Sequence, residues 1–197
     1  MISRLSSIIT EALCKSQVIE ETDKELYIYG FFVLLSKGLF FLVSTIFGWM
    51  FGILWENIAF YIMFSNLRCY AGGFHASKES VCTCYTTVAL FLASLGIWIL
   101  SKVESVIVPL CVLTLCSVVV FLLSPLDSED KPLTYSEYDH YRWKTIAIVI
   151  GMEIISIGAV NLQLPGILYA AAIGMALESC LLILGKAKRF LSHRNNR

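Results

Sequence analysis

The chain has 197 residues, of which 57% are hydrophobic and 15% charged, and its mean hydropathy is +0.75. This composition excludes an ordinary soluble domain and predicts an all-α, polytopic membrane protein with a single membrane-embedded domain over residues 1–197. The formal net charge is zero, so the chain has no overall positive charge that would attract nucleic acid, and we expect no nucleic-acid partner.

The first 25 residues are predicted to form an amphipathic helix. They carry too many charges and no uninterrupted apolar core, which argues against a cleavable signal peptide. Ile2, Leu5, Ile9 and Leu13 recur at helical spacing, with polar residues elsewhere around the turn. We expect this helix to lie on the membrane surface or to pack against the rest of the protein.

Apolar runs in the rest of the chain predict about six transmembrane or re-entrant helices. Residues 26–66 are long enough for two spans of ~20 residues, with a reversal at Gly48 and Gly52, although a segment that crosses only partway is an open alternative. Lys37 and Glu56 fall inside these two segments, and we expect them to pair because charges within a membrane are usually paired. Four further spans are predicted at 82–101, 103–123, 146–160 and 164–184.

The distribution of basic residues predicts the orientation. With six spans, the amphipathic segment, the polar loops at 66–81 and 124–145 and the basic tail at 185–197 all fall on one side of the membrane. All fifteen basic residues except Lys37 and Lys102 are on that side. By the positive-inside rule we expect this side, with both termini, to face the cytoplasm across the inner membrane.

The loop at 66–81 contains the residue types of a catalytic site. A thiol is nucleophilic as thiolate, and an imidazole is the usual group that takes its proton. Two turns of unbroken helix would separate His75 from Cys82, but Gly72 and Gly73 favour a turn that lets His75 fold back. Ser80 is a candidate N-cap that would put Cys82 in the first turn of the next helix. The pattern indicates a cysteine–histidine catalytic pair at the membrane surface.

Other interpretations of these residues stay open. A cysteine in an apolar protein, such as Cys82, is most often a small buried hydrophobe, and a lone histidine near a membrane, such as His75, is often only an interfacial polar group. Cys69 and Cys84 are rival thiols, and with His75 they suggest a zinc site, but the spacing matches no standard zinc motif. We therefore expect no metal and no cofactor, and we expect all seven cysteines to be reduced.

The loop also resembles a known family. In a small polytopic chain, its pattern is similar to that of AgrB, the family of membrane cysteine endopeptidases that process the quorum-sensing precursor AgrD. The matching residues are Arg68, then after a gap of three residues Gly72 and Gly73, then after a gap of one residue His75, and finally Cys82. Ser-Pro-Leu-Asp-Ser-Glu-Asp-Lys-Pro-Leu at 124–133 resembles a second loop of that family. The resemblance covers most of the chain, but its specific part is the first loop.

The resemblance implies a cysteine endopeptidase that acts on an AgrD-like precursor peptide. Cys82, rather than Cys84 or Cys69, is then the nucleophile, and His75 is its base. A cysteine of the bound peptide captures the acyl group from the enzyme and releases a cyclic thiolactone, or a lactone where the peptide offers serine. Water would discharge the thioester, so we expect the site to restrict water.

Four further residues are candidates for substrate binding or positioning. Arg68 is a candidate to hold a carboxylate of an acidic precursor tail, to position the loop, or only to snorkel to the interface. Gly72 and Gly73 either let backbone N–H groups approach the oxyanion or form a plain turn. Lys131 either lines the entrance to the site or belongs to an ordinary loop.

Two other classes of function compete with the protease. Lys37, Glu56, Glu153 and Glu178, in or near apolar runs, suit a small transporter or channel. A non-catalytic membrane scaffold is the other alternative. Besides the precursor we expect membrane lipid as a partner, and the small residues at 170–176, together with the resemblance, suggest a homodimer.

Overall fold

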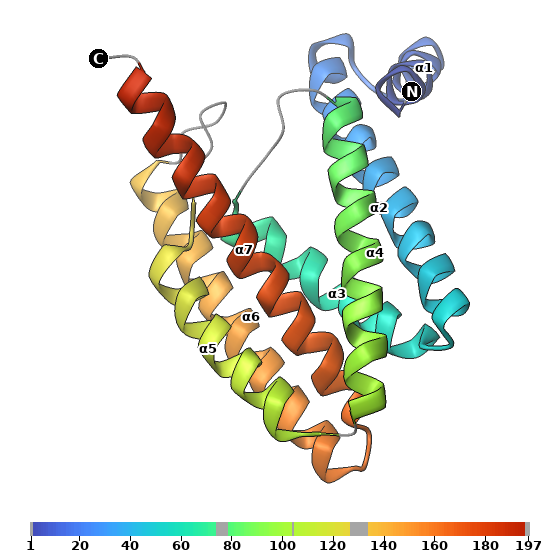
Figure 1. The fold of residues 1–197 in the computed structure, drawn as a ribbon. Coiled ribbons are helices and arrows are strands. Elements are labelled where there is room, and N and C mark those ends of the chain that lie inside the picture. The colour runs from blue at the N-terminus through green and yellow to red at the C-terminus, as the bar shows by residue number, and fades with distance from the viewer. Residues whose placement is uncertain (1, 74–78, 104, 127–133, 196–197) are drawn as a thin grey trace. The chain divides into compact units, whose positions relative to one another are not determined.

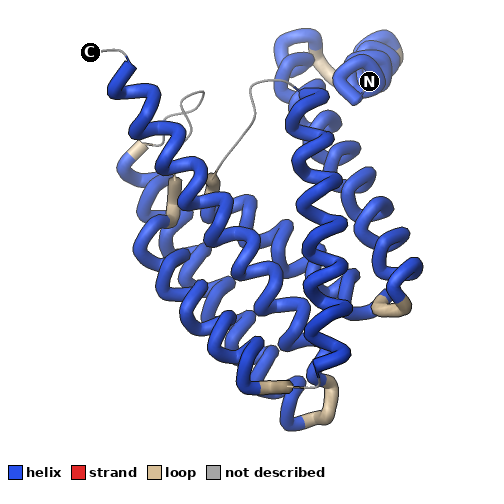
Figure 2. Tube along the Cα trace, viewed as in Figure 1, coloured by secondary structure: helices blue, strands red, loops and turns tan. Residues whose placement is uncertain are grey.

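The structure, a computed structural model, describes residues 2–73, 79–103, 105–126 and 134–195. Every regular element in these ranges is a helix, which confirms the all-α prediction (Figures 1 and 2). The elements are α1 (Ile2–Lys15), the short 3-10 helix η1 (Glu21–Asp23), α2 (Lys24–Phe51), α3 (Leu54–Ala71), α4 (Glu79–Val103), α5 (Ile107–Leu123), α6 (Tyr135–Asn161) and α7 (Pro165–Asn195).

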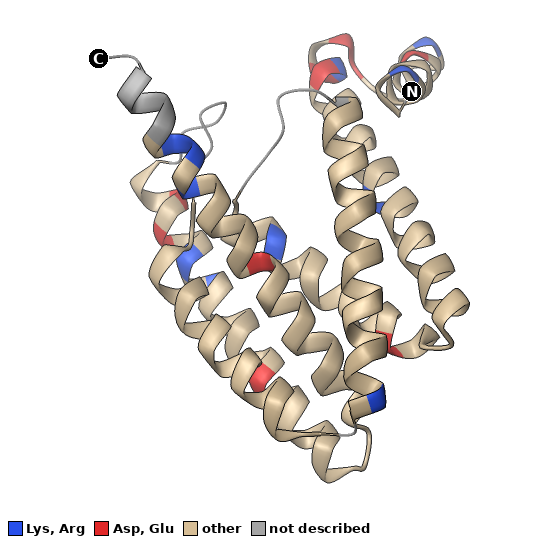
Figure 3. Cartoon of the chain, viewed as in Figure 1, with Lys and Arg blue, Asp and Glu red and all other residues tan. Residues whose placement is uncertain are grey.

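Four helices within the described residues are long and apolar enough to cross a membrane, and most of the ribbon carries no charge (Figure 3). They cover Glu21–Phe51, Ser80–Val103, Tyr135–Asn161 and Pro165–Phe190. The protein is therefore a polytopic membrane protein, as predicted. The other two expected spans do not reach this standard by themselves. α5 has 17 residues, fewer than the ~20 that a span requires, and α3 contains several polar side chains, among them Glu56, Asn57, Asn66 and Arg68.

The chain divides into two compact units, Met1–Val43 and Ser44–Arg197, with the boundary inside α2. In the first unit α1 forms as predicted, and three residues of the predicted apolar stripe, Ile2, Ile9 and Leu13, are half-buried. Ser6 and Thr10 are fully buried, whereas Leu5 and Ile8 are 48% and 62% exposed. The hydroxyls can be buried because each donates to a carbonyl of its own helix, Ser6 to Ser3 and Thr10 to Ser6. The exposed apolar side suits a helix that lies at a lipid interface.

The reversal between α2 and α3 falls at Gly52, as predicted. Gly52 has a φ of +70°, a conformation that favours glycine. Gly48 has a different role from the predicted one, because it lies within α2. A Cβ there would lie 2.7 Å from the Cβ of Asn57 on α3, so the missing side chain allows the two helices to approach closely.

A buried polar network joins α2, α3 and α4 near this reversal. The Nδ2 of Asn57 donates to the Oγ of Ser44 at 3.1 Å and to the Oγ of Ser94 at 2.9 Å. Ser94 in turn donates to the carbonyl of Leu90 in its own helix at 2.8 Å. Buried polar groups require such partners, and hydrogen bonds between helices hold membrane proteins together where lipid removes the hydrophobic driving force.

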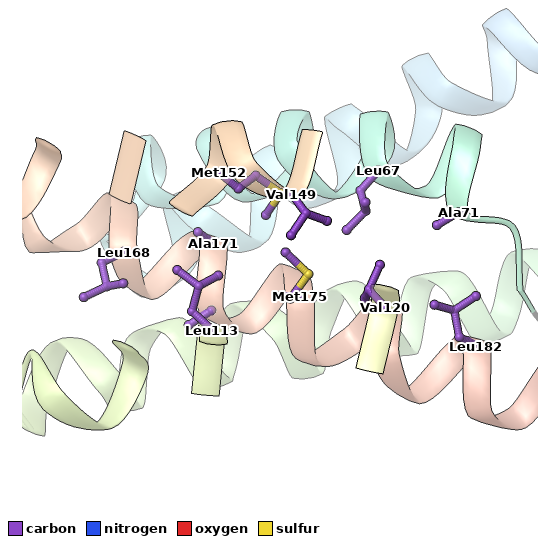
Figure 4. Packing of buried hydrophobic residues seen from close by; sticks show 11 residues of the cluster. Leu67, Ala71, Leu113, Val120, Val149, Met152, Leu168, Ala171, Met175 and Leu182 are labelled. Carbon is purple, nitrogen blue, oxygen red and sulfur yellow. The ribbon is translucent and has the colours of Figure 1, made fainter. Parts of the chain in front are cut away.

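The core of the second unit forms around α7, which packs against α3, α4, α5 and α6 (Figure 1). Buried side chains of α3, α5 and α6, such as Leu67, Leu113 and Met152, converge on Ala171 and Met175 of α7 (Figure 4). The small residues of α7 at 170–172 and 174 are buried within this unit. The predicted close packing of this face is confirmed, but because it occurs inside one chain it provides no argument for a homodimer.

Two polar segments are more helical than predicted. The second loop, expected over 124–145, ends earlier because α6 begins at Tyr135. Thr134 caps that helix: its Oγ1 accepts from the N–H of Glu137, whose carboxylate accepts from the N–H of Thr134. At the other end of the chain α7 continues to Asn195 through the basic tail, because Lys and Arg favour helix and suit the negative end of its dipole.

Candidate active site

The predicted site residues lie at the end of α3 and the beginning of α4. Arg68 is in the last turn of α3, and Gly72 and Gly73 follow that helix directly. Cys82 is in the first turn of α4. The helix begins at Glu79, so Ser80 is inside it and is not its N-cap. His75 and Lys131 lie outside the residues that the structure describes.

The segment after α3 meets the segment after α5. Gly72 and Leu126 form a parallel bridge, and the N–H of Leu126 donates to the carbonyl of Ala71 at 2.9 Å. Gly72 has a φ of +78°, and a Cβ on it would collide with the Leu126 carbonyl oxygen. Glycine is therefore required here by both backbone conformation and space. The two predicted polar loops thus begin side by side at one end of the second unit.

Arg68 holds this glycine segment from the other side. Its Nη1 donates a hydrogen bond to the carbonyl oxygen of Gly72. A Cβ on Gly73, where φ is +120°, would collide with the same guanidinium group and would lie 3.3 Å from the carbonyl oxygen of Leu181 on α7. The structure therefore brings Arg68, Gly72 and Gly73 together, and it explains why neither glycine has room for a side chain.

A buried carboxylate faces Arg68. Glu178 of α7 has no exposed surface on its side chain, and its Oε1 lies 3.5 Å from Nη1 of Arg68, whose side chain is 18% exposed. No hydrogen-bond donor in the described ranges reaches either carboxylate oxygen, so the ion pair is the compensation the structure provides for this buried charge. The sequence indicated Glu178 only as a charge inside an apolar run, which signals a partner without naming it.

Cys82 differs from its rival thiols in exposure. It is partly buried, whereas Cys69 and Cys84 are exposed. Cys84 is two residues further along α4, about 200° around the helix, so it lies on nearly the opposite face. All seven cysteines are among the described residues, and none of them forms a disulfide there. Cys82 takes no part in the contacts among Arg68, Gly72 and Glu178.

Aromatic and basic side chains gather beside the glycine segment. Tyr70 packs edge-on against Tyr141 of α6, with ring centroids 5.9 Å apart. The Nζ of Lys144 lies 4.9 Å from the centroid of the Tyr70 ring. Aromatic rings and lysines of this kind are typical of the boundary between lipid and water.

Metal-binding clusters are absent from the part of the chain that the structure describes, where no group of three or more His, Cys, Asp or Glu residues could hold an ion. Of the ligands considered for zinc, Cys69 and Cys84 are described, while His75 is outside these ranges.

Comparison with known proteins gives one family and two relatives. The family model for accessory gene regulator B (AgrB) matches residues 6–182. An AgrB-like protein of Clostridium perfringens strain SM101 is 26% identical over 167 residues, which cover 80% of this chain and 78% of the relative. AgrB-like protein 2 of C. perfringens strain 13 is 26% identical over 138 residues, which cover 68% of this chain and 64% of the relative. No solved structure matches this chain.

Proposed function

Because this chain belongs to the AgrB family, with a match over residues 6–182, we propose that it is a membrane-embedded cysteine endopeptidase of autoinducer processing. Family membership implies a part in the processing of an accessory gene regulator autoinducer. The proposal adds the reaction: cleavage of an AgrD-type precursor peptide through an acyl-thioester on Cys82, followed by cyclisation.

The position of Cys82 is the observation that carries this proposal. The candidate span of α4 begins at Ser80, so the Cys82 sulfur lies within one turn of the end of a membrane helix. A thiol there is at the boundary between lipid and water, and it is only partly buried, so a peptide bound at the membrane surface has access to it.

The chemistry follows from the two proposed catalytic groups. His75 takes the proton of Cys82, and the thiolate attacks the scissile carbonyl. The C–N bond breaks, and His75 returns the proton to the departing amine, which leaves a thioester on Cys82. A thiol of the bound peptide, whose proton His75 takes, then attacks this thioester, which releases the Cys82 thiolate and closes a thiolactone; a serine hydroxyl would close a lactone in the same way. One thioester is exchanged for another, so no water is consumed.

Charge distribution supports a cytoplasmic site. Lys102, near the end of α4, is at the opposite end of that helix from Cys82. It is one of only two basic residues outside the segments predicted to share a side of the membrane. We therefore propose that Cys82 and both termini face the cytoplasm from the inner membrane.

The transporter alternative loses support from two of its four charged residues. Glu178 pairs with Arg68, and Glu153 accepts a hydrogen bond from the Oγ of Ser117 at 2.8 Å. Charges that line a transport pathway face a cavity or the substrate, whereas these two are engaged by neighbouring helices of the same unit.

Reconstitution tests the proposal. The purified protein is placed in lipid vesicles with a synthetic precursor peptide that carries an internal cysteine and an acidic tail, and the products are identified by mass spectrometry. We expect a cyclic fragment that is lighter, by the mass of one water molecule, than the linear fragment that hydrolysis would give. Cys82→Ala and His75→Ala are expected to abolish it, whereas the matched variant Cys84→Ala keeps activity. Cleavage that survives Cys82→Ala would rule out the mechanism.

A further inference from the structure

The ion pair between Arg68 and Glu178 lies where apolar packing surrounds it. Glu178 is fully buried, and its neighbours in the fold include the core residues Met175 and Leu182 on the same helix. Replacement of a buried ion pair by apolar residues is often neutral or stabilising, so stability alone is a weak reason for such a pair. The geometry around Arg68 suggests another role.

We propose that Glu178 is a positioning residue for the reaction: it holds Arg68, and Arg68 holds the Gly72–Gly73 segment from which the chain continues to His75. This inference rests on the proposed function, because it assigns a role in placing the proposed base. Glu178 does not touch the reacting atoms. It acts through the guanidinium group.

Arginine suits this task because its planar guanidinium group presents five donors in a fixed geometry. One nitrogen, Nη1, is shared between the Gly72 carbonyl oxygen and the Glu178 carboxylate. The carboxylate orients the group and neutralises its charge in a medium of low dielectric constant, where an unpaired charge is costly. Without Glu178 the guanidinium group has no carboxylate on α7 to hold its orientation. Its hydrogen bond to the Gly72 carbonyl oxygen is then no longer fixed in place.

Helix α7 reaches the glycine segment at a second point. Leu181 is three residues after Glu178 and therefore on the same face of α7, and its carbonyl oxygen limits the space beside Gly73. On the far side, the Leu126 carbonyl oxygen limits the space beside Gly72. The segment is thus held between α7 and the residues after α5, with the guanidinium group filling the place of a side chain.

A substrate clamp is the competing role for Arg68, and kinetics separates the two. If Arg68 binds a carboxylate of the precursor, its loss raises KM. If Arg68 and Glu178 position the base, their loss lowers kcat and leaves KM nearly unchanged. Small displacements of a catalytic group cost on the order of 10²-fold in rate.

The test uses Glu178→Gln, Arg68→Gln and the double variant in the reconstituted vesicle assay. We expect each single variant to lower kcat by on the order of 10²-fold with KM changed less than about threefold, and the double variant to be no slower than either single one, because residues that act as a unit are not additive. The matched control is Glu153→Gln, which also neutralises a carboxylate in an apolar helix, and it is expected to keep the wild-type kcat. Full activity in Glu178→Gln, a loss confined to KM, or multiplicative losses would each overturn the inference.

A second measurement requires no substrate. Amide hydrogen exchange of the peptide that contains Ala71, Gly72 and Gly73 is expected to accelerate in Glu178→Gln and to stay unchanged in Glu153→Gln. Unchanged exchange in Glu178→Gln would overturn the positioning role. The two proposals fail separately: activity in Cys82→Ala refutes the protease mechanism, whereas an inactive Cys82→Ala beside a fully active Glu178→Gln refutes only the role of Glu178.

Discussion

Gly72 and Leu126 run side by side as a parallel bridge that joins the end of α3 to the end of α5. The contact leaves no room for a Cβ on Gly72, whose backbone conformation is itself nearly exclusive to glycine. One contact between two backbones therefore holds together the segments from which both polar loops continue.

Substitution of this glycine is expected to damage both stability and activity. Gly72→Ala should lower the free energy of unfolding by about 1–3 kcal/mol from backbone conformation alone, and it should abolish most cyclic product because the Leu126 and Arg68 contacts shift. Unfolding in mixed detergent micelles measures the first effect. Gly158→Ala is the control: its Cβ meets open space, and alanine in a helix is expected to be neutral or slightly stabilising. Equal stability of Gly72→Ala and wild type would contradict the steric argument.

The network around Asn57 is expected to contribute to stability. Asn57→Ala removes the donor to Ser44 and Ser94 and should lower the free energy of unfolding by about 1–3 kcal/mol. Asn66→Ala is the matched control, because Asn66 is exposed and its Nδ2 donates only within α3, to the carbonyl of Ile62 at 2.8 Å. We expect that control to stay within about 0.5 kcal/mol of wild type. A loss at Asn57 no larger than at Asn66 would argue against the network.

The cap of α6 provides a third prediction. Thr134→Ala removes the side-chain acceptor of the capping box and should destabilise the protein by about 1 kcal/mol. Thr134→Ser keeps the hydroxyl and is expected to keep most of the stability. Thermal unfolding in detergent, followed by circular dichroism, measures both variants. If serine and alanine behave alike, the hydroxyl contributes nothing to the cap.

The orientation of the protein is testable by cysteine labelling. In a version that lacks the seven native cysteines, Lys102→Cys should react with a membrane-impermeant maleimide on intact cells. Tyr135→Cys, at a position that is 97% exposed at the beginning of α6, should react only after the cells are opened. The opposite pattern would put the proposed site outside the cytoplasm.

Local signals in the sequence predicted local structure well. Gly52 marked the reversal after α2, and the break between the predicted spans 146–160 and 164–184 agrees with the end of α6 at Asn161 and the beginning of α7 at Pro165. In each case the residues that determine the conformation are adjacent in the chain, so the pattern contains the information. The membrane class was equally clear, because composition alone distinguishes it.

Pairing between distant residues was not predictable in the same way. Sequence indicated that Glu178 requires a partner, but it did not identify Arg68, which is on another helix. It also suggested a pair between Lys37 and Glu56, which stays a prediction. Glu56 lies close to Gly166 at the beginning of α7, where a Cβ would be 2.6 Å from the Cγ of Glu56. Partner choice depends on how helices pack, and a single sequence does not specify that packing.

The faces of helices were predicted less well than the helices themselves. In α1 the stripe residues Ile2, Ile9 and Leu13 are only half-buried and Leu5 is exposed. The fully buried residues are Ser6 and Thr10, because hydroxyls that bond within their own helix tolerate burial. The small face of α7 was interpreted partly as a dimer contact, yet residues 170–172 and 174 are buried within the chain, where α7 packs against α3, α4, α5 and α6. Hydrophobic periodicity is a poor guide to burial in a membrane protein, because the surrounding lipid is as apolar as the protein core.

The acid that neutralises Arg68 is carried by α7, which is translated after α3 to α6. While α3 to α6 are already made, the nascent chain holds a guanidinium group whose counter-charge has not yet been synthesised. The glycine segment therefore gains its full set of contacts only when translation has passed residue 181. The contacts that hold the proposed site are therefore incomplete until most of α7 has been made.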